Sequence, residues 1–263
     1  MENYRPIAQE SIACIIFEKL IVDHLEHFIS ERNLFDDAQH GFTSGMSTCT
    51  QLLGMVHDWA TFLNNHKHFH CIYYDFCRAF DRVNHKLMLR KIRELGVDER
   101  SVQWIRAYLS NMSFQVRLGN HVSYRAPCPS GVPQGSSLGP LLFRIFVLDL
   151  RSTLPEGVSY KLFADDLKIY TSVDGPEDIG KLQRASNAIS QWCVQNDMIK
   201  SVPKCAVMAS DGGVTEYLLN SEPIPTVKEF RDLGVVITPN LGFSTHITNI
   251  VQSASRLCNM IFR

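Results

Sequence analysis

Apolar residues recur at helical spacing in several stretches of this chain, and shorter apolar runs typical of strands lie between them. Helical spacing predicts helices over residues 11–32, 48–63, 84–95, 99–111 and 176–195, and another from about 244. Aromatic and β-branched runs predict strands at 70–76, at 204–209 and on both sides of residues 164–166. Gly119-Asn120 predicts a hairpin turn. Together these elements predict one continuous α+β fold.

An apolar helix is predicted to follow the loop at 130–137 and to reach about residue 150. The stretch around 217–237 is predicted to be hairpin-like.

The composition is that of a globular protein and excludes few functions. The chain has 263 residues, is 45% hydrophobic and carries a net charge of −1. A nucleic-acid binder is more often basic, but binding depends on how charge is distributed, so this class stays open. Eight cysteines form no C-x-x-C pair, and no apolar run approaches a membrane span. We therefore expect a soluble intracellular protein, in the nucleus or the cytoplasm, with no membrane contact.

Phe163-Ala164-Asp165-Asp166 places two adjacent carboxylates between apolar strands. Adjacent like charges repel one another unless a cation offsets them, although a hairpin turn also accommodates aspartates well. Asp75 ends another apolar strand and favours the metal interpretation, because hard oxygen ligands on neighbouring strand ends suit Mg²⁺. Two such ions can activate a 3′-hydroxyl and stabilise a leaving pyrophosphate. Asp81, six residues further on, is expected to be a helix N-cap.

The segment from Gly131 to Pro140 is a loop rich in glycine and proline, and it lies between the two acidic strands in the sequence. The helix that follows it is expected to offer free N–H groups to an anion.

Taken in order, Tyr73–Asp81, Gly131–Pro140 and Phe163–Asp166 resemble motifs of the reverse transcriptases of non-LTR (LINE-type, jockey-like) retrotransposons. The segments 3–7, 39–42 and 230–235 are further landmarks, so the resemblance covers nearly the whole chain. It implies a right-hand polymerase fold, with an antiparallel palm sheet flanked by helices. The implied parts are fingers (1–70), palm (71–225, with a finger-like insertion at about 84–128), a primer-grip hairpin (226–238) and the start of a truncated thumb (239–263).

The resemblance also implies an RNA-directed DNA polymerase. Its substrates would be an RNA template, a DNA primer and a dNTP, and its cofactors two Mg²⁺ ions, or Mn²⁺. Asp75, Asp165 and Asp166 match the catalytic, metal-binding triad, and Lys204 matches a lysine that assists the leaving pyrophosphate as general acid or as a charge. Phe80 matches the ring that excludes a 2′-hydroxyl. The other matches are to nucleotide-binding residues (Phe76, Gln134, Gly135 and Arg5) and to the primer grip (Phe230, Leu233 and Gly234).

Departures from the family pattern support a second interpretation. Thr43 and Met46 stand where the family carries arginines that contact phosphate, and Arg144 puts a charge into an otherwise apolar helix. These changes, with a shortened thumb, are typical of a catalytically impaired remnant that at most binds nucleic acid. A third interpretation, a metal-dependent phosphohydrolase, lacks a water-activating base beside Asp75. The native template and the oligomeric state do not follow from the sequence.

Overall fold

The centre of the protein is an antiparallel sheet. The structure, a computed structural model, describes residues 10–110, 112–213 and 215–262. The strands of the sheet are β1 (His68–Tyr74), β6 (Ser159–Phe163), β7 (Asp166–Val173) and β8 (Ala206–Ala209), in the spatial order β6-β7-β1-β8. β6 and β7 form a hairpin, and β1 pairs with both β7 and β8. Chain segments from both halves of the sequence therefore meet at β1 and β7.

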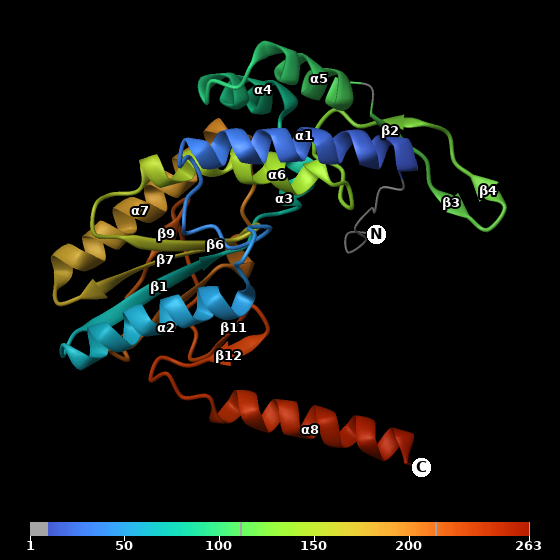
Figure 1. Cartoon of the computed structure of the whole chain (residues 1–263). Helices are drawn as coiled ribbons and strands as arrows, with labels where there is room; N and C mark the ends of the chain where they lie inside the picture. Colours follow the sequence, from blue (N-terminus) through green and yellow to red (C-terminus); the bar gives the residue numbers. More distant parts are fainter. Residues whose placement is uncertain (1–9, 111, 214, 263) are drawn as a thin grey trace.

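Alternation along the strands divides the core between the two faces of the sheet. Ile72 and Tyr74 of β1 belong to a cluster with the buried residues of α6 (Leu138–Phe146) and α7 (Pro176–Gln195). Phe69, Cys71 and Tyr73 belong to a second cluster, which α2 (Thr48–Asn64) covers. Figure 1 shows α1 (Ile12–Glu31) and α6 on one side of the sheet and α2 on the other.

Three helices and a pair of short hairpin ladders extend from the α6 side. The elements are α3 (Ala79–Arg82), α4 (His85–Glu94), α5 (Glu99–Ser110), β2 (Ser113–Phe114), β3 (Arg117–Leu118), β4 (His121–Val122) and β5 (Ala126–Pro127). β3 and β4 pair around Gly119, whose φ is +58°, so the predicted turn is confirmed. Asn84 caps α4 by accepting from Lys86 N and Leu87 N, at 2.9 and 3.2 Å.

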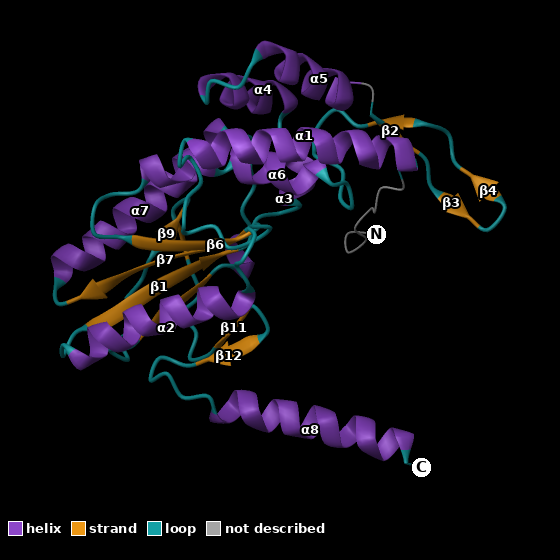
Figure 2. Cartoon of the chain, in the orientation of Figure 1, coloured by secondary structure: helices purple, strands orange, loops and turns teal. Residues whose placement is uncertain are grey.

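The remaining elements follow α6 or β7 in the chain. They are the 3-10 helices η1 (Leu148–Thr153) and η2 (Val202–Lys204), the strands β9 (Leu218–Leu219), β10 (Glu222–Pro223), β11 (Phe230–Asp232) and β12 (Val235–Ile237), and helix α8 (Ser244–Ile261). The single hairpin predicted over 217–237 is instead two ladders, β9 with β10 and β11 with β12. Figure 2 shows α8 standing apart from the sheet.

The α+β fold with a helix-flanked antiparallel sheet is as predicted, although several element boundaries differ. The strand predicted at 70–76 is β1, which ends at Tyr74, and the strand predicted at 204–209 begins at Ala206, after η2. The apolar helix expected to reach about residue 150 ends at Phe146, and η1 continues the chain. Within the described ranges, no helix combines the length and the hydropathy needed to cross a bilayer.

Candidate active site

Asp75, Asp165 and Asp166 lie at one end of the central sheet. Tyr74 pairs with Leu167 at the end of the β1–β7 ladder, and one further step of the same register sets Asp75 opposite Asp166. Asp165 lies in the two-residue turn between β6 and β7, because Phe163 pairs with Asp166. A hydrogen bond also holds the backbone of Asp75, because its carbonyl accepts from Ser201 N at 3.0 Å. The fold thus brings together carboxylates that are distant in the sequence.

The turn that carries Asp165 is fixed by a neighbouring segment. Ala164 has a φ of +57°, which is unfavourable for a residue with a Cβ. Gln39 donates from Nε2 to Ala164 O at 3.2 Å and accepts at Oε1 from Ala164 N at 3.0 Å. A Cβ on Gly41 would lie 2.1 Å from Ala164 N. The sequence marked 39–42 as a landmark, but it gave no sign that these residues hold the acidic turn.

The electrostatics of the three aspartates fit a cation site. One side of Asp166 is exposed to solvent, but the protein around its carboxyl group removes part of the hydration. This desolvation, followed by the negative charges of Asp165, Asp232 and Asp75, raises the pKa of Asp166 to about 6. Carboxylate oxygens are ligands that Mg²⁺ and Mn²⁺ prefer. The residues present therefore fit a divalent ion, which would offset their repulsion.

Lys204 approaches this cluster from η2. Its Nζ lies 3.8 Å from Asp75 Oδ1, and its side chain is 68% exposed. An exposed pair at this separation contributes little to stability. The ammonium group is therefore free to interact with another anion that enters the site.

The glycine- and proline-rich loop is built onto α3. Val83 O and Phe80 O accept from Gly131 N and Val132 N, both at 2.8 Å. Gly131 has a φ of +93°, and a Cβ there would lie 2.8 Å from Asp81 Cα. Gln134 donates from Nε2 to Asp81 Oδ1 at 2.8 Å. The expectation that Asp81 is an N-cap is wrong: the cap position belongs to Arg78, and Asp81 lies inside the helix, facing the loop.

The two aromatic residues of the nucleotide-binding prediction lie in different environments. Phe80 is partly exposed and stacks on Phe143 of α6, with ring centroids 4.4 Å apart. Phe76 is buried, and its ring lies against Trp192. The structure therefore does not bring the side chain of Phe76 into the site, whereas Phe80 remains available. Gly135 is exposed in the loop, and Arg5 lies outside the described residues.

The hairpin predicted as the primer grip is the β11–β12 ladder. Its turn consists of Leu233 and Gly234, with φ of +47° and +90°. Phe230 stacks on Tyr73 of β1 at 3.8 Å between ring centroids. Asp232 forms a buried ion pair with Lys168, on the strand that carries Asp166. The hairpin is therefore fastened to the same two strands that carry the aspartates.

Two further sequence expectations need correction. Arg144 is buried but is not unpaired, because Nη1 lies 2.7 Å from Glu26 Oε1 and donates to Phe42 O at 3.1 Å. The N-terminus of α6 does not offer free N–H groups to an anion. The amides of Ser137 and Leu138 already donate to Glu18 Oε2, at 2.7 and 3.2 Å.

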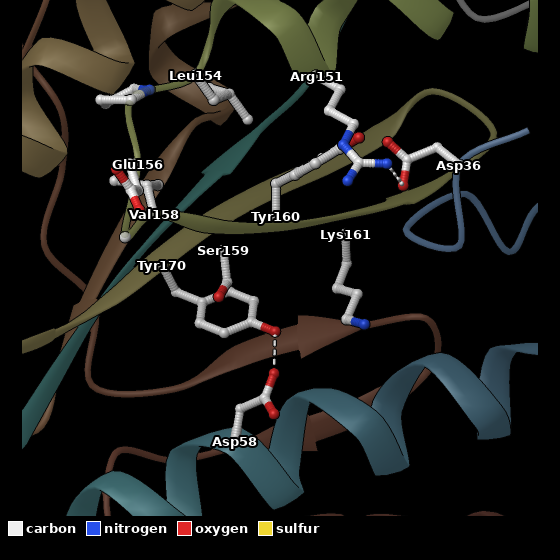
Figure 3. A pocket seen from close by; sticks show the side chains of 12 residues that line it. Asp36, Asp58, Arg151, Leu154, Glu156, Val158, Ser159, Tyr160, Lys161 and Tyr170 are labelled. Carbon is white, nitrogen blue, oxygen red and sulfur yellow. Dashed lines mark hydrogen bonds and ion pairs between the residues drawn. The ribbon is translucent and has the colours of Figure 1, made fainter. Parts of the chain in front are cut away.

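A cavity of about 360 Å³ lies away from the aspartates, at the outer edge of β6. Figure 3 shows Lys161 and Tyr170 at this cavity, with Tyr170 bonded to Asp58 and Arg151 near Asp36. None of the site residues predicted from the sequence lines it. This cavity and the cluster of Asp75, Asp165 and Asp166 are therefore separate features.

Comparison with known proteins shows which family the chain resembles and which relatives are similar to it in sequence. Residues 1–237 match the family model described as "Reverse transcriptase (RNA-dependent DNA polymerase)". The chain is 28% identical to the "Probable RNA-directed DNA polymerase from transposon BS" of Drosophila melanogaster, over 98% of this chain and 29% of that protein. It is also 28% identical to the "RNA-directed DNA polymerase from mobile element jockey" of the same species, over 96% of this chain and 29% of that protein. The chain thus spans less than a third of the length of these relatives.

Solved structures share the fold. The apo telomerase of Candida Tropicalis, truncated from its C-terminal domain, superposes with a TM-score of 0.63 at 13% identity, over 86% of this chain and 44% of that chain. The telomerase of the same species in complex with a fragment of telomeric RNA gives a TM-score of 0.62 at 12% identity, over 89% of this chain and 37% of that one.

Proposed function

Because the chain belongs to the reverse transcriptase (RNA-dependent DNA polymerase) family, we propose that it adds deoxynucleotides to a DNA primer on an RNA template. The resemblance to polymerases of non-LTR retrotransposons, predicted from the sequence motifs, is confirmed by the mobile-element relatives. The observation that carries the proposal is the meeting of Asp75, Asp165 and Asp166 at one end of the β1–β7 ladder.

We assign these three carboxylates to two Mg²⁺ ions, or Mn²⁺. When bound, such ions supply activation of a primer 3′-hydroxyl and charge stabilisation of the leaving pyrophosphate. The raised pKa of Asp166 supports this assignment, because burial and the negative charges of Asp165, Asp232 and Asp75 disfavour its ionised form, and a bound cation would offset both effects. We assign Lys204, whose Nζ lies 3.8 Å from Asp75 Oδ1, to the leaving pyrophosphate, as general acid or as a charge.

Other residues of the chain orient the substrates. The ring of Phe80 is held face to face against Phe143, so it can exclude a 2′-hydroxyl by its volume. Gln134 and Gly135 lie in the loop bonded to α3 and are assigned to the incoming nucleotide and the template base. Phe230, Leu233 and Gly234 are assigned to the primer. In this assignment residues 1–70 are the fingers, 71–225 the palm and 239–263 the start of the thumb.

An impaired enzyme that only binds nucleic acid is the second candidate. Thr43, which donates to Gln39 O at 2.8 Å, and Met46, which is 40% exposed, are both uncharged. Neither side chain therefore provides a cation in the loop before α2. Arg144 gives this candidate no support, because Glu26 pairs with it.

Primer extension on a poly(rA)–oligo(dT) substrate with Mg²⁺ separates the two candidates. The first candidate predicts dTTP incorporation that is lost on replacing Asp165 with Asn. The second predicts substrate binding without incorporation, and Thr43→Arg with Met46→Arg should then restore some synthesis. Binding is expected to weaken steeply with salt in either case, because phosphate contacts release counterions.

A further inference from the structure

A buried carboxylate occupies the start of α6. Glu18 of α1 has no exposed surface, and its Oε2 accepts from the amides of Ser137 and Leu138. The next amide, Gly139 N, donates to Ser136 Oγ at 2.8 Å, and Pro140 has no N–H. A helix leaves its first N–H groups without intrahelical partners. In α6 all of them are bonded within the protein.

Glu18 is suited to this position in charge as well as in geometry. The N-terminus of a helix carries a partial positive charge that stabilises an anion, and bonds from amides to a carboxylate are stronger than neutral ones. These bonds offset the cost of burying the charge. A second anion at the same helix end would be repelled, so a nucleoside triphosphate is excluded from it.

The loop before α6 is consequently anchored at both ends. Gly131 and Val132 are bonded to the backbone of 80–83, and Ser137 is bonded to Glu18. Between the anchors lie Gln134 and the exposed Gly135, whose φ is +98°. The side chain of Gln134 is held as well by its bond to Asp81. Loss of the anchor at Ser137 is therefore expected to loosen the stretch mainly on its Gly135 side.

The surroundings of Glu18 favour this role over that of a metal ligand. The ligand atoms of Glu10, Cys14 and Glu18 lie within 4.8 Å of one another. The Cys14 thiol donates to Glu18 Oε1 at 3.8 Å, while Oε2 is taken by the two amides. Both carboxylate oxygens of Glu18 are therefore already bonded within the protein.

We propose that Glu18 is a positioning residue, which fixes the Gln134–Gly135 loop through the first amides of α6 and fills the anion position at that helix end. That Glu18 holds the loop is inferred from the contacts alone. That the loop is thereby kept in place for the incoming nucleotide rests on the proposed function.

Hydrogen exchange tests the holding of the loop. Glu18→Gln keeps an oxygen acceptor of nearly the same shape but removes the charge. Glu26→Gln is the matched control, since Glu26 also lies on α1 and also contacts α6, through Arg144. We expect amide exchange over 134–138 to quicken about tenfold in Glu18→Gln, because the bonds from the α6 amides lose the strength that the carboxylate charge gives them. Exchange there that stays at the parental rate, or quickens equally in Glu26→Gln, would overturn the proposal.

Steady-state primer extension tests the consequence. Glu18→Gln should raise KM for the dNTP about tenfold while leaving KM for the primer–template unchanged, because only the loop is loosened. Glu18→Asp, which retains the charge, should recover part of the loss. Equal changes in both KM values, or none, would contradict a role in placing the nucleotide. If the parental chain extends no primer, the proposed function fails, and the exchange rates still decide whether Glu18 holds the loop.

Discussion

Gln39 holds the backbone of Ala164 from both sides, bonding its N–H at 3.0 Å and its carbonyl at 3.2 Å. The two residues are 125 positions apart in the sequence. The same segment bonds β6, since His40 N donates to Leu162 O and Leu162 N donates to Ala38 O, both at 2.9 Å. The acidic turn is therefore not an ordinary exposed hairpin end. Its conformation depends on residues 38–41, which pack directly against it.

Gly41→Ala tests this dependence. The added methyl group would lie 2.1 Å from Ala164 N, so the turn must shift. We expect a loss of about 1–3 kcal/mol in the free energy of unfolding, as for other overpacked sites, together with a fall in primer extension. Gly54→Ala, in α2, is the control, because its methyl group would meet only Lys161 Nζ at 3.7 Å. Equal urea midpoints for the two variants would contradict the proposed contact.

The ion pair between Lys168 and Asp232 joins the primer-grip hairpin to β7. Both side chains are buried, so removing one partner leaves a charge without compensation. We expect Lys168→Met and Asp232→Leu each to lower the free energy of unfolding by about 3–5 kcal/mol. The double variant should cost less than either single one, since it buries no charge. A double-mutant cycle by urea denaturation measures this coupling, and additive losses would show the pair to be uncoupled.

Glu10 should make the stability of the protein depend on pH. Burial, and then its bond to Glu18, raises the pKa of Glu10 from 4.5 to about 7. Because the folded-state pKa is the higher one, its contribution to stability is present below pH 4.5 and is lost as the pH rises through 7. Glu10→Gln stays neutral and should match the parent at about pH 4 but be more stable at pH 8. Thermal unfolding across this range checks it. A parent and variant that keep the same difference at every pH would rule it out.

Phe80→Ala tests the choice of sugar. The ring stacks on Phe143 and meets Phe42 edge-on, at 4.4 and 5.9 Å between centroids, so its place is well defined. Removing it should raise the ratio of ribonucleotide to deoxynucleotide kcat/KM about tenfold or more. Competitive incorporation of UTP and dTTP gives this ratio. If an active Phe80→Ala enzyme keeps the parental ratio, the exclusion of the 2′-hydroxyl lies elsewhere.

The sequence predicted the sheet strands, most helices and the residues at the strand ends, because periodicity and turn residues are local signals. Asp75, Asp165 and Asp166 could be found in this way, since each follows an apolar run. The start of α3, at Ala79, could not be found. It depends on Arg78, which takes a φ of +53° at the cap position. A sequence pattern predicts positive φ at glycine and not at arginine.

Interactions between distant segments were the part that sequence patterns missed. Glu18 and Ser137 are 119 positions apart, and Glu26 and Arg144 are 118 apart. A helical pattern shows that such a residue faces the core, but it does not show which side chain or amide group it contacts there. For this reason the sequence showed Arg144 only as a charge within an apolar helix, and the start of α6 as open to an anion. Both interpretations change once the opposing carboxylates on α1 are known.

The measurement that tests the central claim most directly is single-nucleotide extension of an RNA-templated DNA primer by the parental chain and by Asp75→Asn and Asp165→Asn. Each reaction is run with Mg²⁺, with Mn²⁺ and with EDTA, and primer–template binding is measured alongside. We predict extension by the parent that requires a divalent ion, and its loss in both variants with little change in binding. Metal-dependent extension that survives either substitution would contradict the assignment of these carboxylates to catalysis.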